Sequence, residues 1–118
     1  MTAASNVIMV VDDEETICET LKDVLEEEGY AVEIAGDGLD ALEILRGRTI
    51  IPRMIILDLL MPRMDGNTLL TELRGDPSLA EIPVVVSTSD PSRAPSGVLI
   101  MRKPVDLDIL LDTVRKHS

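Results

Sequence analysis

Five charged or hydroxyl side chains follow apolar runs of strand length, and their types suit metal and phosphate chemistry. Asp12 and Asp13 come directly after the run NVIMVV, and Asp58 comes directly after MIIL. Thr88 ends the run IPVVVST, and Lys103 ends GVLIMRK. An acid at the end of a buried strand is costly unless something pairs with it. The chain must therefore supply partners for Asp58.

The residue types predict the role of each group. Neighbouring carboxylates repel one another, and protons or a cation must relieve the repulsion. Mg²⁺ takes oxygen ligands, including one or two carboxylates, and shares phosphate oxygens. A carboxylate beside Mg²⁺ can act as a nucleophile and form an aspartyl phosphate, with Thr88 and Lys103 as donors to the phosphoryl oxygens. Each residue alone has a simpler explanation, such as a helix cap or a solvated charge, but their convergence favours a phosphoryl site.

Alternating apolar runs and helical repeats predict the elements that bring these residues together. The predicted strands cover residues 6–11, 30–35, 53–58, 82–88 and 97–103. The predicted helices lie within residues 14–29, 36–48, 65–76 and 106–118. This alternation predicts an α/β domain spanning residues 1–118, with a five-stranded parallel sheet between helices. We expect a flavodoxin-like, doubly wound sheet of order 2-1-3-4-5, whose strand ends meet at one edge.

One crossover breaks the alternating pattern. The segment SDPSRAPSG, between Thr88 and Val98, contains two prolines and no apolar stripe. Proline costs ~3 kcal/mol inside a helix, and this segment has nothing to offset that cost. We therefore predict that the fourth helix of the fold is missing or reduced to a loop or turn.

Composition narrows the class of partner and the compartment. The net charge is −11 and only 1% of residues are aromatic, so the core must be aliphatic. So acidic a chain repels phosphate backbones and anionic lipid, which argues against direct binding of nucleic acid or membranes. The single cysteine, Cys18, fits a reducing compartment. We read no signal peptide or membrane span and expect a cytoplasmic protein.

The motifs VVDDE, DLLMPRMDG, the ST that ends the fourth strand, and KP after the fifth occur in a recognisable order and spacing. Together with AGDGLDALEIL, they make the chain resemble the receiver domain of bacterial two-component response regulators. The resemblance covers nearly all of the chain. The run from Asp58 to Gly66 is its most specific part.

The resemblance implies a role for each motif residue. Asp58 would accept a phosphoryl group from the phosphohistidine of a histidine kinase or phosphotransfer protein. Asp13 would bind Mg²⁺ directly and Asp12 through water, with Asp58 and the backbone carbonyl of Leu60 as further ligands. Thr88 and Lys103 would contact the phosphoryl group, and the Lys103–Pro104 peptide would be cis. Phosphorylation would then switch contacts with a downstream protein effector or a fused output domain.

Three departures from the family pattern affect the expected behaviour. Ile100 occupies the position where similar domains carry Tyr or Phe as a rotamer switch. The fourth helix, which we predict to be missing or reduced, is part of the usual dimer and effector face of similar domains. Leu60 is apolar where many relatives have a polar residue near the path of the attacking water. This difference implies slow self-dephosphorylation.

Two alternative functions are a pseudo-receiver or scaffold and a phosphatase. A pseudo-receiver or scaffold would use the same fold to bind partners without switching. A haloacid-dehalogenase-like phosphatase also uses an Asp nucleophile, but it has a second Asp two residues later, where this chain has Leu60. We expect no dedicated enzyme activity beyond self-phosphorylation from a phosphodonor and autodephosphorylation. The acidic helix at 14–29 is either a solvated face or a docking face for a basic partner.

Overall fold

A five-stranded parallel sheet forms the centre of the molecule. The computed structural model describes residues 6–47 and 51–117. Its strands are β1 (Val7–Val11), β2 (Ala31–Ala35), β3 (Met54–Asp58), β4 (Val84–Thr88) and β5 (Leu99–Arg102). Their order across the sheet is β2-β1-β3-β4-β5, and every neighbouring pair is parallel. The predicted α/β class and strand order are confirmed.

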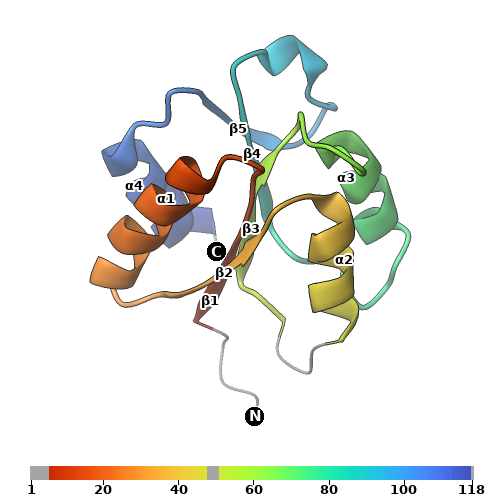
Figure 1. The fold of residues 1–118 in the computed structure, drawn as a ribbon, viewed down its shortest axis with the longest axis horizontal. Coiled ribbons are helices and arrows are strands. Elements are labelled where there is room, and N and C mark those ends of the chain that lie inside the picture. The colour runs from red at the N-terminus through yellow and green to blue at the C-terminus, as the bar shows by residue number, and fades with distance from the viewer. Residues whose placement is uncertain (1–5, 48–50, 118) are drawn as a thin grey trace.

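Two pairs of helices cover the sheet (Figure 1). Helices α1 (Glu15–Glu27) and α4 (Leu107–His117) lie on one face, and α2 (Gly38–Arg46) and α3 (Gly66–Arg74) lie on the other. Asp37 and Asp65 cap α2 and α3, since their carboxylates accept the N–H groups of Asp40 and Thr68. Within residues 6–47 and 51–117, no helix has the length and apolar character that a membrane span requires.

The sheet separates two aliphatic cores. All five residues of β3 are buried, which fits a central strand covered on both faces. Met9, Ile55 and Leu57 belong to the core beneath α2 and α3, whereas Ile8 and Ile56 belong to the core beneath α1 and α4. The alternation along β1 and β3 follows from the two-residue period of a strand. The rigid central strand fixes the position of Asp58 at its carboxyl end.

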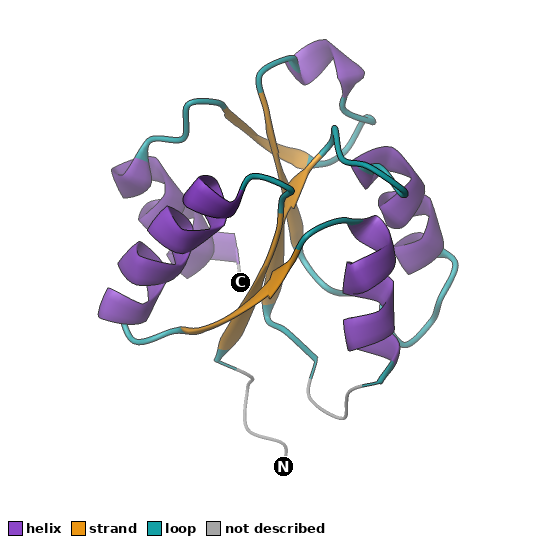
Figure 2. Ribbon diagram, viewed as in Figure 1, coloured by secondary structure: helices purple, strands orange, loops and turns teal. Residues whose placement is uncertain are grey.

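The crossover from β4 to β5 contains no α-helix. It holds a single 3₁₀ turn, η1 (Pro91–Arg93), seen as the small helical turn beyond the carboxyl end of β4 in Figure 2. The prediction that the fourth helix of the fold is missing or reduced is therefore confirmed. Two apolar residues of the edge strand β5 are exposed to solvent: Leu99 is 38% exposed and Ile100 is 43% exposed.

Gly66 allows α3 to approach the end of β3, and its replacement by Ala should destabilise the fold. A Cβ at residue 66 would overlap the carbonyl oxygen of Asp58 and lie 2.8 Å from Leu59 Cα. We expect Gly66→Ala to lower the free energy of unfolding in urea by about 2 kcal/mol, because backbone must shift to relieve the overlap. Gly75→Ala is the control, since its Cβ would meet Thr71 O at an ordinary 3.5 Å. Equal stability of the two variants would contradict the prediction.

Candidate functional site

Three carboxylates meet at the carboxyl edge of the sheet. Asp12 and Asp13 follow β1, and Asp58 ends β3, the neighbouring strand in which Leu57 pairs with Val11. One carboxylate oxygen from each acid lies within 4.8 Å of the other two. Asp12 and Asp58 are buried, at 4% and 6% exposure, whereas Asp13 is exposed. The sheet thus gathers the three acids that the sequence analysis grouped.

Lys103 bridges the two buried acids from the far edge of the sheet. Its Nζ lies 3.1 Å from Asp12 Oδ2 and 3.3 Å from Asp58 Oδ1. Its backbone N–H donates to Thr88 O at 2.9 Å, which fixes the start of the β5–α4 loop against β4. The Lys103–Pro104 peptide is cis, as the resemblance implies. The long side chain crosses the end of β4, the strand between β3 and β5.

Burial and charge shift the proton affinities of Asp58 and Lys103. Burial, followed by the repulsion from Asp12, raises the pKa of Asp58 above its ordinary value, although Lys103 partly opposes the shift. Burial alone would lower the pKa of Lys103, but the attraction of Asp12 and Asp58 outweighs it and raises that pKa. Lys103 is therefore a permanent cation at neutral pH. The site still carries more negative than positive charge when Asp58 is ionised.

The carboxylates offer a donor set that fits a hard divalent cation. Both oxygens of Asp12 are already engaged, since Oδ1 accepts the N–H of Glu14 at 2.9 Å and Oδ2 accepts Lys103. Asp13 and Asp58 supply the remaining carboxylate oxygens of the cluster. One or two carboxylates, with water in the other positions, is the usual coordination of Mg²⁺ in proteins. The acidic cluster is therefore compatible with Mg²⁺.

Thr88 and Leu60 flank the acidic cluster without joining it. The Thr88 side chain is buried, and its hydroxyl accepts the N–H of Asp90 at 3.1 Å and donates to Asp90 O at 3.3 Å. The register of β3 and β4 pairs Asp58 with Ser87, the residue before Thr88. Leu60 is exposed, and its backbone N–H lies near enough to the Asp58 carboxylate to lower its pKa, against the larger effect of burial.

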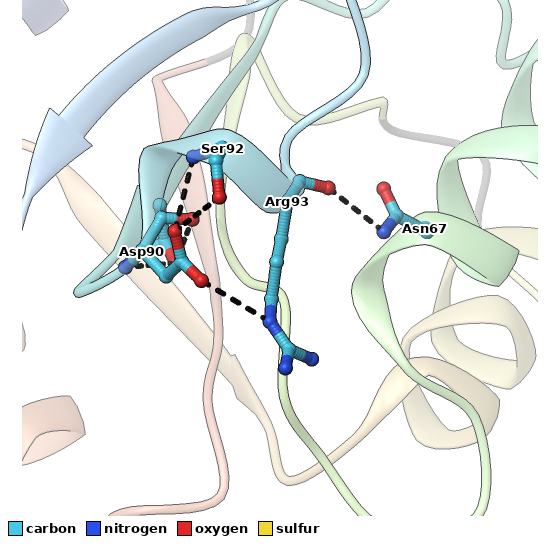
Figure 3. A network of polar contacts seen from close by, with 5 residues as sticks. Asn67, Asp90, Ser92 and Arg93 are labelled. Atoms are coloured by element: carbon cyan, nitrogen blue, oxygen red, sulfur yellow. Dashed lines mark hydrogen bonds and ion pairs between the residues drawn. The ribbon is translucent and has the colours of Figure 1, made fainter.

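A polar network connects Thr88 to the η1 turn and to α3 (Figure 3). The Asp90 carboxylate accepts the Ser92 N–H at 3.2 Å, the Ser92 hydroxyl at 2.5 Å, and Arg93 Nε at 3.3 Å. Asn67, in the first turn of α3, donates its side-chain N–H to Arg93 O at 3.2 Å. A movement of the Thr88 hydroxyl would therefore reach both η1 and the start of α3.

Cys18 lies close to the acids, but its thiol is protonated and therefore a weak nucleophile near neutral pH. Its buried Sγ donates to Asp12 O at 3.3 Å. Burial first, and then the charges of Asp12 and Asp13, raise the pKa of the Cys18 thiol to about 11. Only the thiolate binds metals or attacks electrophiles efficiently.

A second group of charges, which the sequence pattern did not predict, lies beside the loop that follows Asp58. Arg63 lies in this loop and forms ion pairs with Asp37 and Asp40 at the start of α2. The signal in the sequence was limited to Asp37, whose position before a predicted helix is typical of a cap. Nothing in the spacing of Asp37 and Arg63 indicates that they pair.

Comparisons with known proteins agree on one family. The family described as response regulator receiver domain matches residues 8–115. The chain is 38% identical over 82 residues to the response regulator MprA of Mycobacterium tuberculosis, an alignment that covers 70% of this chain and 34% of MprA. The chain thus spans about a third of the length of the curated relatives it matches.

Solved structures show the same likeness. The signal receiver domain of a signal transduction histidine kinase from Syntrophus aciditrophicus is 36% identical, with a TM-score of 0.82, covering 93% of this chain and 87% of that one. The chemotaxis protein CheY4 of Vibrio cholerae is 26% identical, with a TM-score of 0.83, covering 98% of this chain and 100% of that one. The similarity therefore extends over almost the whole fold.

Removing the charge of Asp58 should stabilise the metal-free protein. We expect Asp58→Asn to raise the free energy of unfolding at pH 7 in EDTA by about 1 kcal/mol, an ordinary single-site effect. The raised pKa means that the folded state binds the Asp58 proton more tightly than the unfolded state. Ionisation therefore costs stability as the pH rises above the ordinary value of 3.8, and the gain from Asn should disappear below that pH. Urea unfolding across this range measures the difference.

Magnesium should reverse the order of stability. At saturating Mg²⁺ the wild type should gain stability through ligand binding, whereas Asp58→Asn should gain much less because it lacks one carboxylate. The same urea titrations, repeated with Mg²⁺, test this outcome. If Mg²⁺ stabilises both proteins equally, then Asp58 is not a ligand of Mg²⁺.

Proposed function

The chain belongs to the response regulator receiver domain family, and from that premise we propose that the carboxylate of Asp58 accepts a phosphoryl group from a partner's phosphohistidine. The observation that carries the proposal is the buried Asp58 carboxylate, 3.3 Å from Lys103 Nζ and beside two further acids. A buried acid with a shifted pKa and a specific charge partner is typical of a functional site. We further propose that residues 1–118 act as one receiver domain in the cytoplasm.

The transfer forms one bond and breaks another. An oxygen of Asp58 attacks phosphorus, the P–O bond forms, and the P–N bond of the phosphohistidine breaks. The electron pair of the broken bond remains on the imidazole nitrogen of the donor protein. Lys103 holds Asp58 in its ionised form and then donates to an oxygen of the transferred group, because its ammonium stays anchored by Asp12.

We propose Asp13, Asp58 and the Leu60 carbonyl as the protein ligands of Mg²⁺, with Asp12 acting through water. The engagement of both Asp12 oxygens with Glu14 and Lys103 supports this division. When bound, Mg²⁺ would offset the negative charge on the phosphoryl oxygens as they approach the acids. The chain's own contribution is to hold three carboxylates within reach of one small ion.

A groove beside the acidic cluster supports a protein as the phosphodonor. It lies between α1 and the loop after β5, has a volume of about 420 Å³, and includes Lys103 in its wall. Its other lining residues include the apolar side chains of Ile17, Leu21, Pro104 and Leu107. We propose that a histidine kinase or phosphotransfer protein rests in this groove while presenting its phosphohistidine to Asp58.

The output runs through the η1 turn rather than through an aromatic residue on β5. Ile100 offers no ring or hydroxyl, so a movement of Thr88 has no such partner there. Thr88 instead bonds to Asp90, which holds Ser92 and Arg93. Recruitment of the Thr88 hydroxyl by a phosphoryl oxygen would disturb this turn and change contacts with an effector or a fused output domain.

The alternative is a scaffold that binds partners without switching. The missing fourth helix and the exposed side chains of Leu99 and Ile100 favour it, because both alter the surface through which a switch would be read. The complete set of acids and Lys103 favours a phosphorylated receiver. The two functions differ in whether a phosphoryl group at Asp58 changes the conformation of the η1 turn.

Phosphorylation itself is tested by intact mass. Wild-type protein treated with acetyl phosphate and Mg²⁺ should gain the mass of one phosphoryl group, and EDTA should prevent the gain. Asp58→Asn should gain none. Asp65→Asn is the matched control, since Asn caps a helix as well as Asp and residue 65 should therefore keep its capping bond to Thr68. A wild type that gains no mass, or an Asp58→Asn variant that gains as much, would refute the assignment of Asp58.

Switching through η1 is tested with beryllofluoride, a stable mimic of the phosphoryl group. With Mg²⁺ and beryllofluoride, the amide resonances of Ser92 and Arg93 and the side-chain amide of Asn67 should shift. Thr88→Ala should still bind the mimic but should lose these shifts, because the bond between residues 88 and 90 is gone. Saturated wild-type protein whose η1 resonances stay in place would favour the scaffold.

A further inference from the structure

Arg63 fastens the loop after Asp58 to the start of α2. Its Nε donates to Asp37 Oδ2 at 2.6 Å, and its Nη2 donates to Asp40 Oδ1 at 2.9 Å. Arg63 has a φ of 62°, and it is the only residue other than glycine with a positive φ in the described parts of the chain. Such a backbone conformation is uncommon for a residue with a Cβ and needs support from its surroundings.

Asp37 gives this contact a rigid base. Its side chain is only 7% exposed, and its Oδ1 accepts the N–H of Asp40 as the cap of α2, which leaves Oδ2 for Arg63. Next to it, the Gly38 N–H donates to Met64 O at 3.1 Å, and a Cβ at Gly38 would lie 2.8 Å from that oxygen. The loop and the start of α2 are therefore in direct backbone contact at the point where Arg63 binds.

The same loop carries the backbone that faces the acidic cluster. The Leu60 backbone N–H lies near enough to the Asp58 carboxylate to lower its pKa slightly, against the larger effect of burial, and at the other end of the loop the Gly66 N–H donates to Leu59 O at 2.9 Å. The side chain of Leu60 is 58% exposed, so it adds little to hold its own backbone in place. The pair formed by Arg63 and Asp37 is an additional fixed point, three residues beyond Leu60.

We propose that the ion pair between Arg63 and Asp37 positions the backbone of Leu60 for Mg²⁺ and for the phosphoryl group at Asp58. This inference rests on the proposed function. Arg63 is a positioning residue and not a catalytic one, because its guanidinium is bound to Asp37, the cap of α2, and to Asp40 in its first turn. Groups that orient a metal ligand typically change metal affinity or activity by about 10- to 100-fold when removed. Small displacements of a reacting group have similar effects on rate.

The test compares two arginines of similar exposure. Arg63 and Arg46 are 54% and 52% exposed, and both form ion pairs. Arg46 lies at the far end of α2 and pairs with Glu72 of α3. Calorimetry gives the Kd of Mg²⁺ without phosphodonor, and intact mass gives the phosphorylation rate with acetyl phosphate at saturating Mg²⁺. We expect Arg63→Ala to weaken Mg²⁺ binding and to slow phosphorylation, each by about tenfold. Arg46→Ala should stay within about twofold of wild type, and Arg63→Lys should recover part of the loss.

Asp37→Asn provides a second route if Arg63→Ala does not fold. Asn keeps the helix cap but removes the charge that Arg63 binds. It should impair Mg²⁺ binding less than Arg63→Ala does, and the double variant should be no worse than Arg63→Ala alone, as expected for two partners of one contact. The melting temperatures of all variants show whether a weaker Mg²⁺ affinity comes from a less stable fold or from a displaced Leu60 backbone in a stable fold.

Two results would overturn the inference in distinguishable ways. If wild-type protein is phosphorylated and the Arg63→Ala and Arg46→Ala variants have the same Kd and rate, then the positioning role is wrong and the proposed function stands. If wild-type protein is not phosphorylated under any of these conditions, then the proposed function is wrong and the inference falls with it.

Discussion

The repulsion among three carboxylates, and its partial relief by one ammonium, is the constraint on which the site depends. Asp12 and Asp58 are buried, and an unpaired charge in such a position would be strongly destabilising. Lys103 contacts both, at 3.1 and 3.3 Å, so neither is left alone. One cation cannot neutralise three acids, and the remaining negative charge makes the cluster compatible with a divalent ion. Because Asp12 also pairs with Lys103, the ammonium would keep one partner if Asp58 were phosphorylated.

The fold satisfies this constraint through strand order. β1 and β3 are neighbours, so their carboxyl ends bring Asp12, Asp13 and Asp58 together without a long side chain. Lys103 comes from the edge strand and must reach past β4, which only a long flexible side chain can do. Groups at the ends of packed strands are held more rigidly than groups in loops. The loop after Asp58 therefore needs fixed points of its own, and Gly66 and Arg63 supply them.

Apolar runs predicted the strands, and the acids that follow the first and third runs predicted the acidic cluster, because both depend on local pattern and on the topology of a parallel sheet. The prolines of SDPSRAPSG likewise predicted the loss of a helix from local chemistry. The partner of Arg63 could not be predicted, since a long exposed side chain chooses among several acids only when the tertiary structure is formed. The same holds for Thr88, whose bond to Asp90 depends on the path of a short crossover. The roles of Asp58, Thr88, Lys103 and Leu60 stay predictions.

The short crossover also lowers the free energy that would be needed to move the segment between β4 and β5. A helix over this face would bury several aliphatic side chains, each contributing about 1.5–3 kcal/mol, and would be hard to displace. The η1 turn has no buried residue and is held by hydrogen bonds, each with a net contribution of about 0.5–1.5 kcal/mol. A single charge-assisted bond between Thr88 and a phosphoryl oxygen is of comparable size. Loss of the helix is therefore compatible with switching, because a bond of this size would be enough to disturb the turn that replaces the helix.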